Sequence, residues 1–299
     1  MARLAIYTER YTIRSSVELT ALSNFRSAAF ELGHEADFIF KNELKYLRNY
    51  DAVFIRALTD PLNTSYVVAR WAEIQGKRVL DTAASIRICC DKVAMYRRLA
   101  RAGVPLPVTR CLREAEVDVP HAAELFDTLG TPLVLKAPNS SFSAYVDKVT
   151  STDAFVQVGQ RFLRRADRLI VQQYLPSQFD WRVIILHGRV LAVVQYRFAT
   201  DTWRTMDRAA DGSSAHTRCF ARADAPDELL AVARAAAAAI GDSLYGVDLK
   251  EVDGAYVVIE VNDNPTIAAT EEDQANPEIY SEIVRYLVEG EGAFDGRVR

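Results

Sequence analysis

The chain has 299 residues, 49% of them hydrophobic, and its 36 basic and 40 acidic residues give a net charge of -4. This length allows a large core in one large or two modest domains, and the nearly balanced charge leaves no broad positive field to hold nucleic acid. Four cysteines without paired CxxC spacing, and no signal-like or membrane-spanning run, predict a cytoplasmic protein with no membrane partner.

The first eighty residues alternate short β-branched runs with amphipathic stretches. The strand-like runs are 4–7, 36–40, 52–55 and 78–80, and the amphipathic stretches are 17–32 and 66–75. This alternation predicts a small open α/β sheet, which we assign to an N-terminal domain over residues 1–91. No GxGxxG motif follows the first run, which disfavours a dinucleotide oxidoreductase.

The middle of the chain predicts a smaller α+β subdomain over residues 92–172. It opens with a helix from Lys92 to Arg101, because Asp91 is a suitable N-cap and Gly103 with Pro105 supplies the stop. Strands are expected at 133–136, 145–149 and 169–173, with a helix between residues 153 and 164.

The last third, residues 173–299, predicts a C-terminal subdomain with two hairpins. The first pairs 181–186 with 190–196, the second runs from 247 to 261 around Asp253-Gly254, and a helix spans 227–240. The four histidines are scattered and none has nucleophile-like spacing to a serine or cysteine, so we expect structural or exposed positions for them.

The second hairpin carries the polar side chains that matter most. An odd-length loop of three residues places Asp248 opposite or diagonal to Glu260, with Asn262 on the same face. The apolar residues Val247, Leu249, Val257, Ile259 and Val261 then share the other face. A two-residue loop would separate Asp248 from Glu260, so the hydrophobic pattern favours the register that clusters the three.

Two carboxylates and an amide oxygen on one face suit Mg²⁺, which prefers hard oxygen ligands and shares its shell with water and phosphate. Glu260 is placed to bridge two ions. The alternative is that Asp248, Glu260 and Asn262 are ordinary solvent-facing positions of a half-exposed hairpin.

Five landmarks follow one another along nearly the whole chain and together carry a family resemblance. They are Asp91-Lys92 with Ala102-Gly103-Val104-Pro105, Pro132-Leu133-Val134-Leu135-Lys136, Ile170-Val171-Gln172-Gln173-Tyr174-Leu175, Asp180-Trp181-Arg182, and Gly246-Val247-Asp248 with Glu260-Val261-Asn262. In this order they resemble the ATP-grasp superfamily, most closely its RimK and glutathione-synthetase branch. The tail Glu260-Val261-Asn262-Asp263-Asn264-Pro265 looks like a RimK-like subgroup. The resemblance implies an α/β (α+β) ATP-grasp fold preceded by an open α/β domain.

The resemblance also implies roles around ATP. Lys92 and Lys136 match the two phosphate-binding lysines, although Lys136 could instead end an exposed edge strand. Lys92 could be a plain first-turn residue, where the helix dipole disfavours its charge. Gln173 and Tyr174 match the hinge that holds adenine, with Gln173 in place of a common glutamate, and Asp180 matches a residue near the ribose.

Several arginines match positions around the reacting centre. Arg182 and Arg197 match catalytic guanidiniums, with surface salt bridges as the alternative, and Arg204 beside Trp203 matches another phosphate contact. Ile55-Arg56 with Asp60-Pro61 looks like the branch's Arg-x-Asp-Pro loop with two extra residues, which makes Arg56 a candidate substrate residue. Asn264, in the RimK-like tail, is the second candidate substrate residue.

The loop over the phosphates departs most from the family pattern. It reads Ala137-Pro138-Asn139-Ser140-Ser141-Phe142-Ser143-Ala144 and has no glycine. Backbone amides with Ser141 and Ser143 could still cap phosphates, and the alternative is a plain turn between strands.

The resemblance implies an ADP-forming ligase that joins a small-molecule carboxylate to an amine, such as an amino acid or peptide, through an acyl phosphate. It would use ATP with Mg²⁺ or Mn²⁺, with two ions expected, and could act as a homo-oligomer. Two other functions stay open: a phosphotransferase that acts on a hydroxyl, and a non-catalytic ATP-binding module. Hydroxamate trapping separates the first from a ligase, and ATP binding without ADP formation would favour the second.

Overall fold

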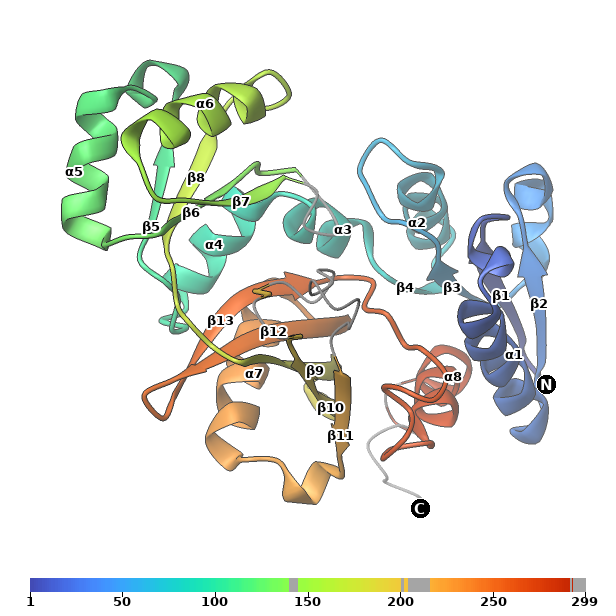
Figure 1. Ribbon diagram of the computed structural model, residues 1–299. Helices are drawn as coiled ribbons and strands as arrows, with labels where there is room; N and C mark the ends of the chain where they lie inside the picture. The colour runs from blue at the N-terminus through green and yellow to red at the C-terminus, as the bar shows by residue number, and fades with distance from the viewer. Residues whose placement is uncertain (140–144, 200–201, 204–215, 291, 293–299) are drawn as a thin grey trace.

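The computed structural model describes residues 1–139, 145–199, 202–203, 216–290 and 292. These residues form three β-sheets, each covered by helices and arranged in the chain order that the sequence predicts (Figure 1). No helix in this described part of the chain has the length and hydropathy needed to cross a bilayer.

The N-terminal sheet is parallel and open, as the alternating pattern predicts, with strand order β2-β1-β3-β4. Its elements are β1 (Arg3–Thr8), η1 (Thr12–Arg14), α1 (Ser16–Glu31), β2 (Glu35–Ile39), η2 (Lys41–Asn49), β3 (Ala52–Arg56), α2 (Thr64–Ile74) and β4 (Arg78–Leu80). Helix α8 (Ile279–Glu289), from the far end of the chain, packs beside α1 (Figure 1). Its Ile283 and Leu287 share one core with Leu4 and Phe25, so the N-terminal unit is completed by the C-terminal helix.

The second sheet is antiparallel, with strand order β5-β8-β6-β7. Its elements are β5 (Thr109–Leu112), η3 (Glu114–Glu116), α5 (Val119–Leu129), β6 (Leu133–Lys136), β7 (Val146–Val149), α6 (Thr152–Leu163) and β8 (Leu169–Gln173). Strand β6 lies between β8 and β7, and Lys136 at its end is opposite Ile170 on one side and Val146 on the other. Lys136 is therefore not on an edge strand.

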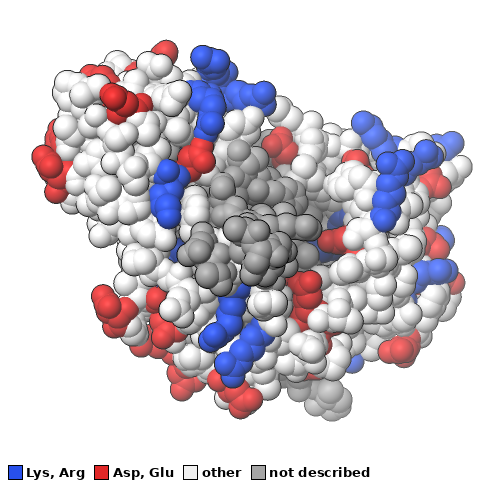
Figure 2. Space-filling model, in the orientation of Figure 1, with Lys and Arg blue, Asp and Glu red and all other residues white. Residues whose placement is uncertain are grey.

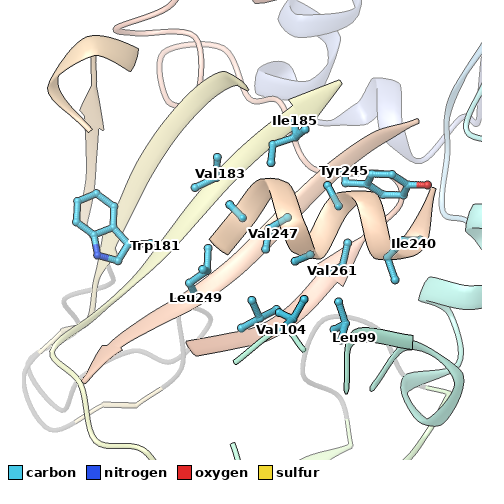
Figure 3. Packing of buried hydrophobic residues seen from close by; sticks show 14 of the residues in the cluster. Leu99, Val104, Trp181, Val183, Ile185, Ile240, Tyr245, Val247, Leu249 and Val261 are labelled. Atoms are coloured by element: carbon cyan, nitrogen blue, oxygen red, sulfur yellow. The ribbon is translucent and has the colours of Figure 1, made fainter. Parts of the chain in front are cut away.

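The third sheet is antiparallel and has the order β11-β10-β9-β12-β13. Its elements are β9 (Phe179–Leu186), β10 (Arg189–Arg197), β11 (His216–Phe220), η4 (Arg222–Asp224), α7 (Asp227–Ile240), β12 (Leu244–Val252) and β13 (Ala255–Asn262). One face packs on α7 through a fully buried cluster that includes Val183, Val247, Leu249 and Val261 (Figure 3). The other face is therefore the one that presents Asp248 and its neighbours.

Helix α4 (Lys92–Arg101), which follows α3 (Ala83–Cys89), begins as predicted, because the Asp91 side chain accepts from the backbone N–H of Val93 and Ala94. Its Leu99 lies in the same core as the strands of the third sheet (Figure 3). The division at residues 92–172 placed α4 in the small subdomain, whereas the helix packs with the C-terminal sheet.

The β12–β13 hairpin differs from the expected three-residue loop. Asp253 and Gly254 alone connect the strands, and both have positive φ angles, 50° and 81°, as an Asp-Gly turn of the primed type requires. The expectation of an odd-length loop is therefore wrong. A β-bulge at Ile259, which has no partner in β12, shifts the register by one residue and still brings Asp248 opposite Glu260.

The bulge also changes which residues are buried. Val258 is fully buried together with Val247, Leu249 and Val261, whereas Val257 and Ile259 are half-buried. Val257 and Ile259 therefore do not complete the apolar face as expected, because the shifted register substitutes Val258.

Charged side chains of both signs are interspersed over the molecular face shown in Figure 2.

Candidate active site

The three predicted metal-binding side chains lie together on one face of the β12–β13 hairpin. Asp248 is opposite Glu260, and Nδ2 of Asn262 donates to Oδ2 of Asp248 over 3.0 Å. The described residues contain no group of three or more His, Cys, Asp or Glu side chains arranged to hold a metal. A magnesium site here would thus need the amide of Asn262 and further oxygens from water or phosphate.

Each carboxylate of this pair is held by a cation. Nε and Nη2 of Arg182 donate to the two Asp248 oxygens at 2.7 and 2.9 Å, and Nζ of Lys92 donates to Oε1 of Glu260 at 2.7 Å. Burial alone would raise the pKa of Glu260, but Lys92, helped by Lys136 and Arg182, outweighs burial and lowers that pKa. Glu260 is therefore ionised at neutral pH, as a metal ligand must be.

Both predicted phosphate-binding lysines are buried, with Lys92 only 4% and Lys136 only 6% exposed. Nζ of Lys136 donates to the Tyr96 hydroxyl over 3.0 Å. Desolvation lowers the pKa of Lys136 to about 8, although the charges of Glu260 and Asp180 oppose the shift. This burial and the central position of β6 exclude the exposed edge-strand alternative for Lys136. Lys92 is the first residue of α4, and its buried ammonium is paired with Glu260.

The predicted hinge residues Gln173 and Tyr174 lie at the end of β8. The backbone N–H of Gln173 donates to the Val108 carbonyl over 3.0 Å. The Tyr174 ring meets Trp203 edge-on at 6.3 Å between centroids, and the Lys148 ammonium lies 4.8 Å from the Tyr174 centroid. Aromatic faces beside a cation suit a planar base and its phosphates.

Asp180 is paired with a lysine that the sequence analysis missed. Nζ of Lys250 donates to Oδ1 of Asp180 at 2.6 Å and to Oγ of Ser177 at 2.7 Å. Burial raises the pKa of Asp180 in spite of this partner. Lys250 follows Asp248 by two residues on the same strand, so the period of two could have placed both side chains on one face.

Arg182 lies in the site, but Arg197 does not, and this corrects the prediction for Arg197. Arg182 is on the face of Asp248 and stacks over the Tyr196 ring at 5.2 Å. Arg197 is exposed, pairs in register with Phe179 and stacks over the Phe179 ring at 5.5 Å. Successive side chains of a strand point to opposite faces, so Arg197 and Tyr196 diverge.

The buried Glu272 is linked to Arg182 through Tyr196, whose ring lies under the Arg182 guanidinium. The Tyr196 hydroxyl donates to Glu272, whose other oxygen accepts the backbone N–H of Ala268 at 2.7 Å. The charge of Glu272 also acts on the Arg182 guanidinium. Glu272 lies in a loop beyond any recognisable motif, which explains why the sequence did not reveal it.

The two candidate substrate residues are joined to each other across the domains. Nη1 of Arg56, at the end of β3, donates to Oδ1 of Asn264 at 2.7 Å and to the Pro265 carbonyl at 2.9 Å. Nδ2 of Asn264 returns a hydrogen bond to the Ala57 carbonyl at 2.6 Å. The pair ties the N-terminal sheet to the segment directly after Asn262.

Three of the predicted nucleotide-binding residues, Ser141, Ser143 and Arg204, lie outside the described residues. Residues 140–144 of the predicted phosphate loop also lie outside the described residues, so the phosphate-binding role of residues 137–144 stays a prediction.

Comparison with known proteins identifies relatives along most of the chain. Residues 89–287 match the family model of the RimK-like ATP-grasp domain. A probable alpha-L-glutamate ligase from Sodalis glossinidius is 29% identical over 231 residues, which cover 75% of this chain and 73% of that protein.

Two solved structures share the fold. D-alanine–D-alanine ligase from Bacillus anthracis complexed with ATP superposes with a TM-score of 0.74 at 19% identity, covering 97% of this chain and 96% of that one. A RimK domain ATP-grasp protein from Sphaerobacter thermophilus gives a TM-score of 0.70 at 21% identity, with coverages of 96% and 99%.

Proposed function

The chain belongs to the RimK-like ATP-grasp family and is an ATP-dependent ligase that forms an amide bond, and we propose that it works through an acyl phosphate at the site described above. The predicted family and the α/β ATP-grasp fold are confirmed. One observation supports the site assignment: Asp248, Glu260 and Asn262 lie on one face of the hairpin, Lys92 binds Glu260, and the buried Lys136 lies close enough for the charge of Glu260 to act on it.

The described side chains fit a nucleotide with its metal, because two hard, half-buried carboxylates and an amide lie beside two buried cations. Asp248, Glu260 and Asn262 would hold Mg²⁺, or Mn²⁺ in its place, and we expect two ions. The bound metal would neutralise phosphate charge. Lys92 and Lys136 then bind phosphate oxygens, Tyr174 and Trp203 contact the base, and Asp180 accepts from the ribose.

In the proposed reaction a substrate carboxylate oxygen attacks the γ-phosphorus, the bond to the β-phosphate oxygen breaks, and ADP leaves an acyl phosphate behind. An amine then attacks the acyl carbon, loses a proton and expels phosphate. Arg182 stabilises the tetrahedral oxyanion that forms after the amine attacks and before phosphate leaves. Arg182 has five N–H donors and gives only two of them to Asp248, so others can reach the oxyanion.

An amino acid is the proposed amine or acid substrate, because the curated relatives carry the name alpha-L-glutamate ligase. Arg56 and Asn264 are proposed to shape its site from the N-terminal side. All four cysteines are free thiols, which supports action in the reducing cytoplasm, and assembly as a homo-oligomer is part of the proposal.

Hydroxylamine trapping tests the reaction class. The protein, Mg²⁺, ATP and a panel of amino acids and their N-acyl derivatives are expected to give ADP together with a hydroxamate, detected by mass. The same panel without hydroxylamine, with the acids and amines in pairs, should give the amide. A hydroxyl phosphotransferase would form ADP with a phosphorylated alcohol and no hydroxamate, and that result would reject the ligase mechanism.

A second expected result concerns pH. A lysine is charged below its pKa, so the affinity for Mg-ADP should be nearly constant from about pH 7 to about pH 8 and fall as Lys136 loses its proton above it. Glu260, Asp180 and Lys92 are the charged groups around it. In Lys136→Arg the guanidinium stays charged, so the decline should disappear from the range of pH 7 to 9.5 in calorimetric titrations. A decline with the same midpoint in that variant would contradict the assignment.

A further inference from the structure

A tyrosine hydroxyl joins one phosphate-binding lysine to the strand that carries the metal ligands. Tyr96 is 5% exposed and lies on α4. Its hydroxyl donates to the Ile259 carbonyl at 2.7 Å and accepts from Nζ of Lys136 at 3.0 Å. The hydroxyl is thus a bridge between β6 and β13, two strands from different sheets.

The direction of these hydrogen bonds follows from the groups present. An ammonium has only donors and a carbonyl has only acceptor lone pairs, so the single hydroxyl proton belongs to Ile259 and the oxygen receives Lys136. Burial raises the pKa of Tyr96, which keeps the hydroxyl protonated at neutral pH. Oε1 of Gln172 lies farther away, at 3.4 Å.

The bulge in β13 provides the acceptor. Ile259 is the residue that the register between β12 and β13 skips, and its carbonyl is the one that Tyr96 binds. The same irregularity that turns Glu260 toward Asp248 therefore also supplies the anchor for Tyr96.

Helix α4 makes this anchor rigid. Lys92, Met95 and Tyr96 share one helix face and contact three successive residues of β13: Tyr96 binds the Ile259 carbonyl, Lys92 binds Glu260, and the Met95 sulfur accepts the backbone N–H of Val261 at 3.2 Å. Leu99, one turn further on, is buried in the core of the third sheet (Figure 3).

We propose that Tyr96 is a positioning residue for nucleotide binding, which acts by holding the Lys136 ammonium at a fixed place beside Glu260. An ammonium has three N–H donors, so one hydrogen bond to Tyr96 leaves two for phosphate oxygens and fixes the rotamer of a long, flexible side chain. The inference rests on the proposed role of Lys136 in phosphate binding.

Tyr96→Phe tests this, because phenylalanine keeps the ring and removes only the hydroxyl. Affinity for Mg-ADP, measured by calorimetry, is expected to fall on the order of tenfold, since hydrogen bonds to charged groups have about this effect. Affinity for adenosine, which has no phosphate, should stay within about twofold. Tyr245→Phe is the matched control: its buried hydroxyl pairs with Oγ of Ser85 at 2.7 Å instead of with a lysine, and its loss should leave Mg-ADP affinity within about twofold.

A double-mutant cycle separates positioning from general stability. In the Lys136→Met background, Tyr96→Phe should change Mg-ADP affinity by less than about twofold, because the side chain through which it acts is gone. A tenfold loss in that background, or equal losses for ADP and adenosine, would overturn the proposal. If Lys136→Met alone leaves Mg-ADP affinity unchanged, the assigned role of Lys136 fails instead.

Discussion

Glu260→Ala is expected to lower the rate of ADP formation by about a thousandfold, on the order of 4 kcal/mol at the transition state. The variant removes a proposed metal ligand and also the partner that holds Lys92 in place. Both the metal and Lys92 are proposed to stabilise the charge on the phosphates, so the variant weakens two stabilising interactions at once. The Glu260 side chain is 29% exposed, so water can reach the Lys92 ammonium in the variant, and the protein should stay folded. A coupled ADP assay measures the rate, and a thermal melt checks the fold.

Glu251→Ala is the control on the same hairpin. Glu251 accepts a hydrogen bond from Nε1 of Trp181 at 3.1 Å and takes no part in the cluster around Asp248. Its loss should leave the rate of ADP formation within about threefold of the unaltered protein. If Glu260→Ala retained more than a tenth of the activity while folded, Glu260 would not be a metal ligand.

Arg182→Lys is expected to lower kcat by about 100- to 1000-fold with little change in the KM for ATP. Lysine cannot reproduce the two parallel hydrogen bonds to Asp248, so the cation that faces the developing oxyanion is lost or misplaced. Single-turnover measurements with saturating ATP give kcat separately from nucleotide binding.

Arg197→Lys provides the comparison, because both arginines matched the family's catalytic positions. Arg197 stacks on Phe179 on the opposite face of the sheet, so its substitution should change kcat by less than about threefold. If Arg182→Lys and Arg197→Lys lowered kcat equally, the position of Arg182 on the face of Asp248 would not explain its catalytic role.

Two β-bulges explain where sequence reasoning about this site held and where it failed. A regular hairpin with the turn at Asp253-Gly254 would place Asp248 and Glu260 on opposite faces, and the bulge at Ile259 reunites them. A regular hairpin around His187-Gly188 would place Arg197 on the face of Arg182, and the irregularity at Leu191 moves it away. A shift of one residue in the strand register moves every later side chain of that strand to the other face of the sheet. The alternation of polar and apolar residues does not predict where such a shift occurs.

Local signals sufficed where the determining interactions are local. The N-cap of Asp91 and the stop after Arg101 predicted α4 at its observed bounds. The burial of Lys136 was not accessible in this way, because it depends on Tyr96 and on the contact between two sheets. Glu272 and helix α8 depend on long-range packing in the same manner.

A crystal structure of the protein with Mn²⁺ and a non-hydrolysable ATP analogue, in which anomalous scattering locates the ion, tests the metal and phosphate site most directly. We expect Mn²⁺ bound by oxygens of Asp248, Glu260 and Asn262, with the Lys92 and Lys136 ammoniums on the phosphates. An ion held elsewhere, or phosphates out of reach of both lysines, would contradict this site assignment.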